Sequence, residues 1–117
     1  MEEQFCEVVI TADDPEWLAG FTRALVEERL AACGHLVQPI RSIYRWDGAV
    51  HDEPEARVAL HTRRSLVAAI VARVEEAHGY EVPCVLALPV TGGNPAYLAW
   101  IANETVGPAG DAPGDGE

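Results

Sequence analysis

The stretch that decides the fold is LVQPIRSIYRWDGAVHDEPEARVALHT, residues 36–62. Its two arms, Leu36–Trp46 and Val50–Thr62, alternate side chains between two faces as strands do. Between them stands Asp47-Gly48, a dipeptide that tolerates positive φ at both central positions of a two-residue turn. The stretch therefore predicts a long β-hairpin.

Two prolines modify this hairpin. Proline has no N–H to donate to a strand ladder, so Pro39 marks an edge or a bulge in the first arm. By the same reasoning Pro54 interrupts the second arm, whose regular part is expected to start near Glu55.

On either side of the hairpin, strand-like and helix-like patterns alternate. Short β-branched runs favour strands, and apolar residues spaced three and four apart favour helices. The expected elements are a strand at Cys6–Thr11, a helix at Pro15–Cys33, a helix at Ser65–His78, a strand at Cys84–Val90 and a short helix from Pro95 onward. Gly34 is expected to end the first helix because glycine readily takes positive φ.

This order predicts an α+β fold, a ferredoxin-like βαββαβ sandwich with a four-stranded antiparallel sheet in the order 4-1-3-2. Two helices cover one face of the sheet. The other face, expected to carry residues such as Ile43 or Val58, stays bare in a single chain and predicts self-association. The domain is expected to occupy residues 1–105, and residues 106–117, rich in Gly, Pro and Asp, are expected to form a disordered tail.

Charge narrows the choice of partners. The chain of 117 residues has eight basic residues, all arginine, and 19 acidic ones, so its formal net charge is −11. Binding to nucleic acid or to an anionic membrane depends on basic residues, so neither partner is expected. No apolar run is long enough to span a bilayer and no export signal is recognisable, which predicts a cytoplasmic protein.

Three residues form the first candidate metal site. Cys33, His35 and His61 fall at the same end of the predicted sheet, and a two-residue turn pairs His61 with Gly34, so that Cys33 and His35 flank it. Thiolate and imidazole are ligands that copper and zinc prefer. A bulge at Pro39 would change this register and the face that His61 occupies. The alternative is a buried cysteine beside two hydrogen-bonded surface histidines.

A second candidate lies at the opposite end of the sheet. There His78 and Cys84 are expected near Asp13, Asp14 and Tyr80, where a metal could bind with carboxylate help. The alternative for His78 is a favourable interaction with the dipole of the helix that it ends.

Blocks spread along the chain resemble the CutA divalent-cation tolerance family from about Val8 to Thr105. They are Glu28–Cys33, Ser42–Gly48, Thr62-Arg63, His78–Pro83, Leu86–Val90 and Gly93–Trp100. The resemblance implies a ferredoxin-like homotrimer built through long hairpins, a cytoplasmic location and a role in tolerance of copper and other divalent cations. It implies metal binding, which is proposed for the family, and no established catalytic reaction.

The chain departs from the family pattern at several positions. His61 stands in place of a lysine, His35 displaces an asparagine, and Cys84 replaces a glutamate. Of the positions at which some members are proposed to bind copper, here Ile10, Ala77 and His78, only the last retains a ligand.

Three other functions are weighed against metal binding, one of them a purely structural scaffold, since a very stable trimer needs no ligand. The family's fold resembles that of PII-type sensors, so an anionic small molecule could bind between subunits through Arg45 and Arg63. A small acylphosphatase-like hydrolase would need an arginine-bearing loop after the first strand, and Thr11–Asp14 is acidic instead. The common catalytic motifs for hydrolases and nucleotide-binding enzymes are absent, so no enzymatic activity is expected.

Overall fold

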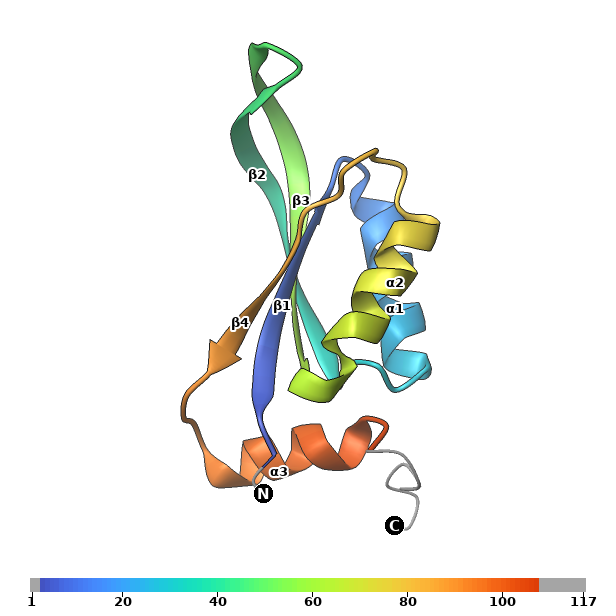
Figure 1. Ribbon diagram of the computed structural model, residues 1–117, viewed down its shortest axis with the longest axis vertical. Coiled ribbons are helices and arrows are strands. Elements are labelled where there is room, and N and C mark those ends of the chain that lie inside the picture. The colour runs from blue at the N-terminus through green and yellow to red at the C-terminus, as the bar shows by residue number, and fades with distance from the viewer. Residues whose placement is uncertain (1–2, 108–117) are drawn as a thin grey trace.

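The structure, a computed structural model, describes residues 3–107 (Figure 1). Its elements are β1 (Phe5–Ala12), α1 (Pro15–Glu27), β2 (Cys33–Trp46), β3 (Ala49–Arg63), a 3-10 turn (Arg64–Leu66), α2 (Val67–Ala77), β4 (Val85–Val90) and α3 (Pro95–Glu104). The four strands form one antiparallel sheet in the order β2-β3-β1-β4, which confirms the predicted α+β fold and strand order. The predicted tail falls largely on residues 108–117, outside the described residues.

The hydrophobic core lies between the sheet and the two helices α1 and α2, which cover one face (Figure 1). Alternate residues of the central strands point into it, as period-two alternation requires. The fully buried side chains of these strands and helices include Val8, Ile10, Val58, Leu60, Leu18, Leu25, Ile70 and Val74. The expectation that Val58 lies on the bare face is therefore wrong, because the hairpin register turns it toward the helices.

The hairpin extends well beyond the helices, and Asp47 and Gly48 form its turn with φ of 52° and 80°. The predicted interruption at Pro54 is wrong, since β3 is continuous and Pro54 pairs with Arg41. At that point, among residues 3–107, β3 pairs with β2 alone, because pairing with β1 ends at Ala56. This is the kind of edge position at which a strand tolerates proline.

The first helix ends earlier than its apolar pattern predicts. It stops at Glu27, and Arg29 takes the left-handed conformation with φ of 61°, so Gly34 is not the helix terminator. Gly34 instead lies inside β2, where an added Cβ would come within 2.6 Å of Thr22 Cγ2 on α1. The apolar pattern continues past the helix because Ala31, in the connection to β2, is also buried.

A bulge in β2 sets the register at the root of the hairpin. Between Val37 and Ile40 the pairing shifts by one residue, so His61 pairs with Cys33 rather than with Gly34 as predicted. Paired residues share a face of the sheet, and a one-residue shift moves a side chain to the other face. The bulge therefore places Cys33, His35 and His61 together on the face opposite α1 and α2.

This second face carries apolar side chains that the chain itself does not cover. Val37, Leu86 and Leu88 are 52%, 63% and 47% exposed. Ile43 in the outer hairpin is 63% exposed, but it pairs with Asp52, which shares a side of β3 with Val58, so the expectation that Ile43 lies on the bare face is also wrong. At one end of the sheet, α3 lies across the direction of the strands instead of running along them (Figure 1). None of the helices within residues 3–107 is long and apolar enough to cross a membrane.

Candidate functional site

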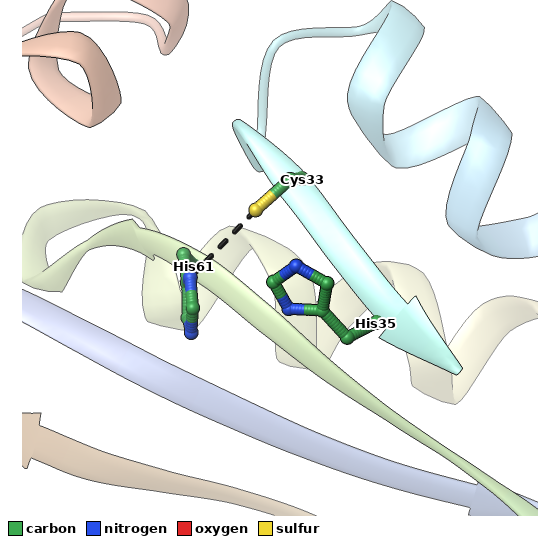
Figure 2. Close-up of side chains that lie close together, drawn as sticks. All are labelled: Cys33, His35 and His61. Carbon is green, nitrogen blue, oxygen red and sulfur yellow. Dashed lines mark hydrogen bonds between the residues drawn. The ribbon is translucent and has the colours of Figure 1, made fainter. Parts of the chain in front are cut away.

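A cysteine and two histidines converge at the root of the hairpin. Cys33 begins β2, His35 follows two residues later on the same face, and His61 lies opposite Cys33 on β3 (Figure 2). Their ligand atoms all lie within 4.8 Å of one another, and Cys33 Sγ lies 3.7 Å from His61 Nδ1. Within residues 3–107 this is the one group of three or more such side chains that lie so close.

The imidazole of His61 is held from both sides by side chains. Its Nε2 lies 3.0 Å from Glu7 Oε2, and its Nδ1 lies 2.6 Å from the Tyr97 hydroxyl. A carboxylate only accepts hydrogen bonds, so Nε2 donates to Glu7, and in the neutral imidazole Nδ1 then presents a lone pair. That lone pair points to the side on which the thiol of Cys33 lies.

Tyr97 also contacts the thiol, with 3.3 Å between its hydroxyl oxygen and Cys33 Sγ. Burial raises the pKa of Tyr97 to about 12, and the hydrogen bond with Cys33 and the negative charge of Cys33 and Glu7 act in the same direction. The hydroxyl therefore stays protonated at neutral pH, and it donates to Nδ1 of the neutral imidazole of His61.

His35 completes the group from the more exposed side. Its ring lies edge-on to that of His61, with 5.2 Å between the centroids. Its side chain is exposed to solvent, whereas Cys33 and His61 are half-buried. Within a single chain the cluster is thus open to solvent on the side of His35.

Local contacts explain why the chain folds this way here. The Ala32 amide donates to the His61 carbonyl at 2.9 Å, and the Thr62 hydroxyl donates to the Leu30 carbonyl at 2.6 Å. These bonds extend the strand pairing into the connection from α1. They fix the register that places Cys33 beside His61.

The two ends of α3 are held by different kinds of contact. Asn94 caps its first turn by accepting hydrogen bonds from the amides of Ala96 and Tyr97. At its other end, Arg63 donates to the Ala102 carbonyl and to the Thr105 hydroxyl. Arg63 also pairs with Glu3, so this arginine is committed to the fold and is not free to bind an anionic ligand.

Sequence reasoning missed Glu7 and Tyr97. The predicted strand order could have indicated Glu7, because β1 and β3 are neighbours in it. In their antiparallel pairing Glu7 lies opposite His61. Tyr97 fits the apolar pattern of a short helix, and nothing local indicates that the helix meets the hairpin root.

The second candidate site has a different character. His78 Nε2 donates to the Thr11 carbonyl at 2.8 Å, and its Nδ1 accepts from the Tyr80 amide at 3.1 Å. Its ring also packs edge-on against Trp17. Both ring nitrogens are therefore satisfied by the backbone.

Cys84 belongs to a neighbouring open groove of about 680 Å³, which it lines together with Tyr80, Tyr44 and Trp46. In the part of the chain that the structure describes, no third cysteine, histidine or acidic side chain joins His78 and Cys84 in a compact ligand group. The structure brings together the first predicted ligand set and not the second.

The hairpin-root cluster, formed by Cys33, His35 and His61, has the ligand types and spacing that suit a metal ion. Zinc binds cysteine sulfur at about 2.3 Å and histidine nitrogen at about 2.0 Å, which places tetrahedral ligand atoms about 3.3–3.8 Å apart. The 3.7 Å between Cys33 Sγ and His61 Nδ1 is within that range. A ring nitrogen of His35 lies within 4.8 Å of a ligand atom of each of the other two residues.

Comparisons with known proteins agree with this fold. Residues 6–104 match the family described as CutA1 divalent ion tolerance protein. The chain is 40% identical over 98 residues to the Divalent-cation tolerance protein CutA of Thermus thermophilus, covering 84% of this chain and 95% of that protein. It is 39% identical over 98 residues to Protein CutA, chloroplastic, of Arabidopsis thaliana, covering 84% of this chain and 54% of that protein.

The chain thus spans about half the length of that plant relative, and nearly all of the bacterial one. Among solved structures, CutA1 from Oryza sativa superposes with a TM-score of 0.85 at 37% identity, covering 88% of this chain and 94% of that one. The match extends over every strand and helix of the described fold, and the chain belongs to the CutA1 family of divalent ion tolerance proteins.

Proposed function

We propose that this protein supports divalent-cation tolerance by binding a metal ion, copper first, at Cys33, His35 and His61, and that it catalyses no reaction. The observation that carries the proposal is that one thiol and two imidazoles converge. Their ligand atoms all lie within 4.8 Å of one another, with Cys33 Sγ 3.7 Å from His61 Nδ1. Thiolate and imidazole suit copper and zinc better than they suit magnesium or calcium.

Glu7 supports the same interpretation. Histidines that bind metals usually donate their second ring N–H to a carboxylate or carbonyl, which fixes the tautomer and orients the ring. Glu7 stands in that relation to His61, with 3.0 Å between Oε2 and Nε2. The net charge of −11 also favours the approach of cations over anions.

We further propose that the chain acts as a homotrimer. The helix-free sheet face exposes Val37, Leu86 and Leu88, and the outer hairpin exposes Ile43 and Trp46. Apolar surface of this kind marks contact sites between proteins, and sister chains would cover it. Sedimentation at micromolar concentration should give three times the chain mass, and a monomer would contradict this part of the proposal.

The cytoplasmic location stays a prediction. The Arabidopsis relative is described as chloroplastic, so family membership does not determine the compartment. Fractionation of cells that express the full gene, with detection by antibody, decides this point.

The metal proposal is tested by titrating the purified protein with Cu(I), Cu(II) and Zn(II) in a calorimeter. Cys33→Ser, His35→Ala and His61→Ala should each weaken the preferred metal by at least about 100-fold, because each removes a ligand. His78→Ala and Cys84→Ser are the matched controls and should bind within about two-fold of the wild type. Equal affinity in all five variants would overturn the proposal.

A further inference from the structure

The Tyr97 hydroxyl contacts two of the proposed ligands at once. Its hydroxyl oxygen lies 2.6 Å from His61 Nδ1 and 3.3 Å from Cys33 Sγ, while those two ligand atoms lie 3.7 Å apart. The Nδ1 atom has a single lone pair, which accepts either the hydroxyl proton or a metal ion. The hydrogen bond and the metal therefore exclude each other.

We propose that the Tyr97 hydroxyl is a built-in competitor for the metal, so that an ion entering the cluster displaces Tyr97 and moves the N-terminal half of α3. The inference rests on the proposed metal site and adds its regulation. The metal-free state keeps His61 and Cys33 bridged by Tyr97, and the metal-bound state releases that bridge.

The two halves of α3 are held very differently. The C-terminal half is anchored by Arg63 through Ala102 and Thr105, and Ile101 is buried with 2% of its surface exposed. The Val106 amide adds a bond to the Arg29 carbonyl at 2.9 Å.

By contrast, within residues 3–107 the hydrogen bonds from the N-terminal half to the sheet are those of Tyr97 to Cys33 and His61, and Leu98 beside it is half-buried. Tyr97 is 38% exposed, and it stacks on Trp100, which is 39% exposed, with 5.4 Å between the ring centroids. The cap formed by Asn94 lies within the helix's own first turn and moves with it. Loss of the Tyr97 bridge therefore affects this half while Arg63 retains the other.

Trp100 gives a direct readout of this movement. The chain has three tryptophans, so a Trp17→Phe, Trp46→Phe background leaves Trp100 as the one fluorophore of its kind. Zn²⁺ is the probe, because it has no redox chemistry and a filled d shell. Saturating zinc should shift the Trp100 emission with the same midpoint as calorimetric binding, and EDTA should reverse the shift.

The affinity test uses Tyr97→Phe, which removes the hydroxyl and keeps the ring. In this variant zinc no longer has to break the hydrogen bond between the Tyr97 hydroxyl and His61. Zinc should therefore bind about five-fold more tightly. Tyr80→Phe is the matched control, since its hydroxyl binds Glu55 away from the cluster, and it should bind zinc as the wild type does.

The outcomes separate the two proposals. Tighter binding by Tyr97→Phe together with the Trp100 shift supports the competitor. Unchanged or weaker zinc binding by Tyr97→Phe, or an unchanged Trp100 spectrum at saturating zinc, overturns the competitor proposal. If Cys33→Ser still abolishes zinc binding in that case, the proposed metal site stands. Absence of zinc and copper binding by the wild type, or zinc binding that Cys33→Ser does not weaken, overturns both.

Discussion

Two histidines at opposite ends of the same sheet differ in what holds them. His78 is bonded through both ring nitrogens to backbone groups, the Thr11 carbonyl and the Tyr80 amide. His61 is bonded through both ring nitrogens to side chains, those of Glu7 and Tyr97. Backbone partners cannot leave without disturbing the fold, whereas a side-chain partner can rotate away. The first histidine is therefore part of the framework, and the second can exchange a partner for a metal ion.

The largest expected effect is the stabilisation of the protein by zinc, which should depend on His61 and not on His78. Zinc held at about 100 times its dissociation constant should raise the free energy of unfolding of the wild type by about 2.7 kcal/mol. His78→Ala should keep this increment and His61→Ala should lose it. Chemical denaturation with and without zinc measures the difference, and an equal increment in both variants would remove the distinction between the two histidines.

Without metal the order of the two variants should reverse. His78→Ala leaves the Thr11 carbonyl and the Tyr80 amide without their partner, which should lower the free energy of unfolding by about 2 kcal/mol. His61→Ala should cost less than about 1 kcal/mol, because Glu7 and Tyr97 can turn to water. Equilibrium denaturation of both variants in EDTA compares them, and a greater loss in His61→Ala would contradict the framework role of His78.

A glycine between two of the proposed ligands sharpens the contrast further. Gly34→Ala places a methyl group 2.6 Å from Thr22 Cγ2 and should lower the free energy of unfolding by about 1.5 kcal/mol. Gly20→Ala, where no atom lies within 4 Å of the added Cβ, should be stabilising by about 0.5–1 kcal/mol because it removes a helical glycine. Thermal and chemical unfolding of the pair gives both values, and a neutral Gly34→Ala would show that β2 is not pressed against α1.

The smallest effect concerns the carboxylates that accompany the two ends. Glu7→Gln removes the charge that orients His61 and should weaken zinc binding by about ten-fold, equivalent to about 1.4 kcal/mol. Glu55→Gln, whose partner is the Tyr80 hydroxyl, is the matched control and should leave zinc affinity unchanged. Calorimetry on the two variants decides whether Glu7 supports the ligand or merely neighbours it.

The sequence predicted the strand and helix order, the sheet order and the end of the sheet at which Cys33, His35 and His61 meet. These follow from local periodicity and from the Asp47-Gly48 turn, which the structure confirms. Hydrophobic alternation and turn chemistry act over a few residues, so they are legible in a single chain.

Other features depended on contacts between distant segments. Pro39 marked a bulge, but the turn alone paired His61 with Gly34, and the one-residue shift that places it opposite Cys33 emerged from the whole sheet. The early end of α1 depends on a left-handed Arg29, a conformation that no glycine signalled. Tyr97 reaches the cluster only because α3 folds back across the hairpin root.

The central claim is that Cys33, His35 and His61 together hold one metal ion. X-ray absorption on the zinc-loaded protein tests it most directly, because the method counts the atoms around the ion. We expect one sulfur at about 2.3 Å and two imidazole nitrogens at about 2.0 Å, with the sulfur lost in Cys33→Ser. A shell of oxygen and nitrogen without sulfur in the wild type would contradict it.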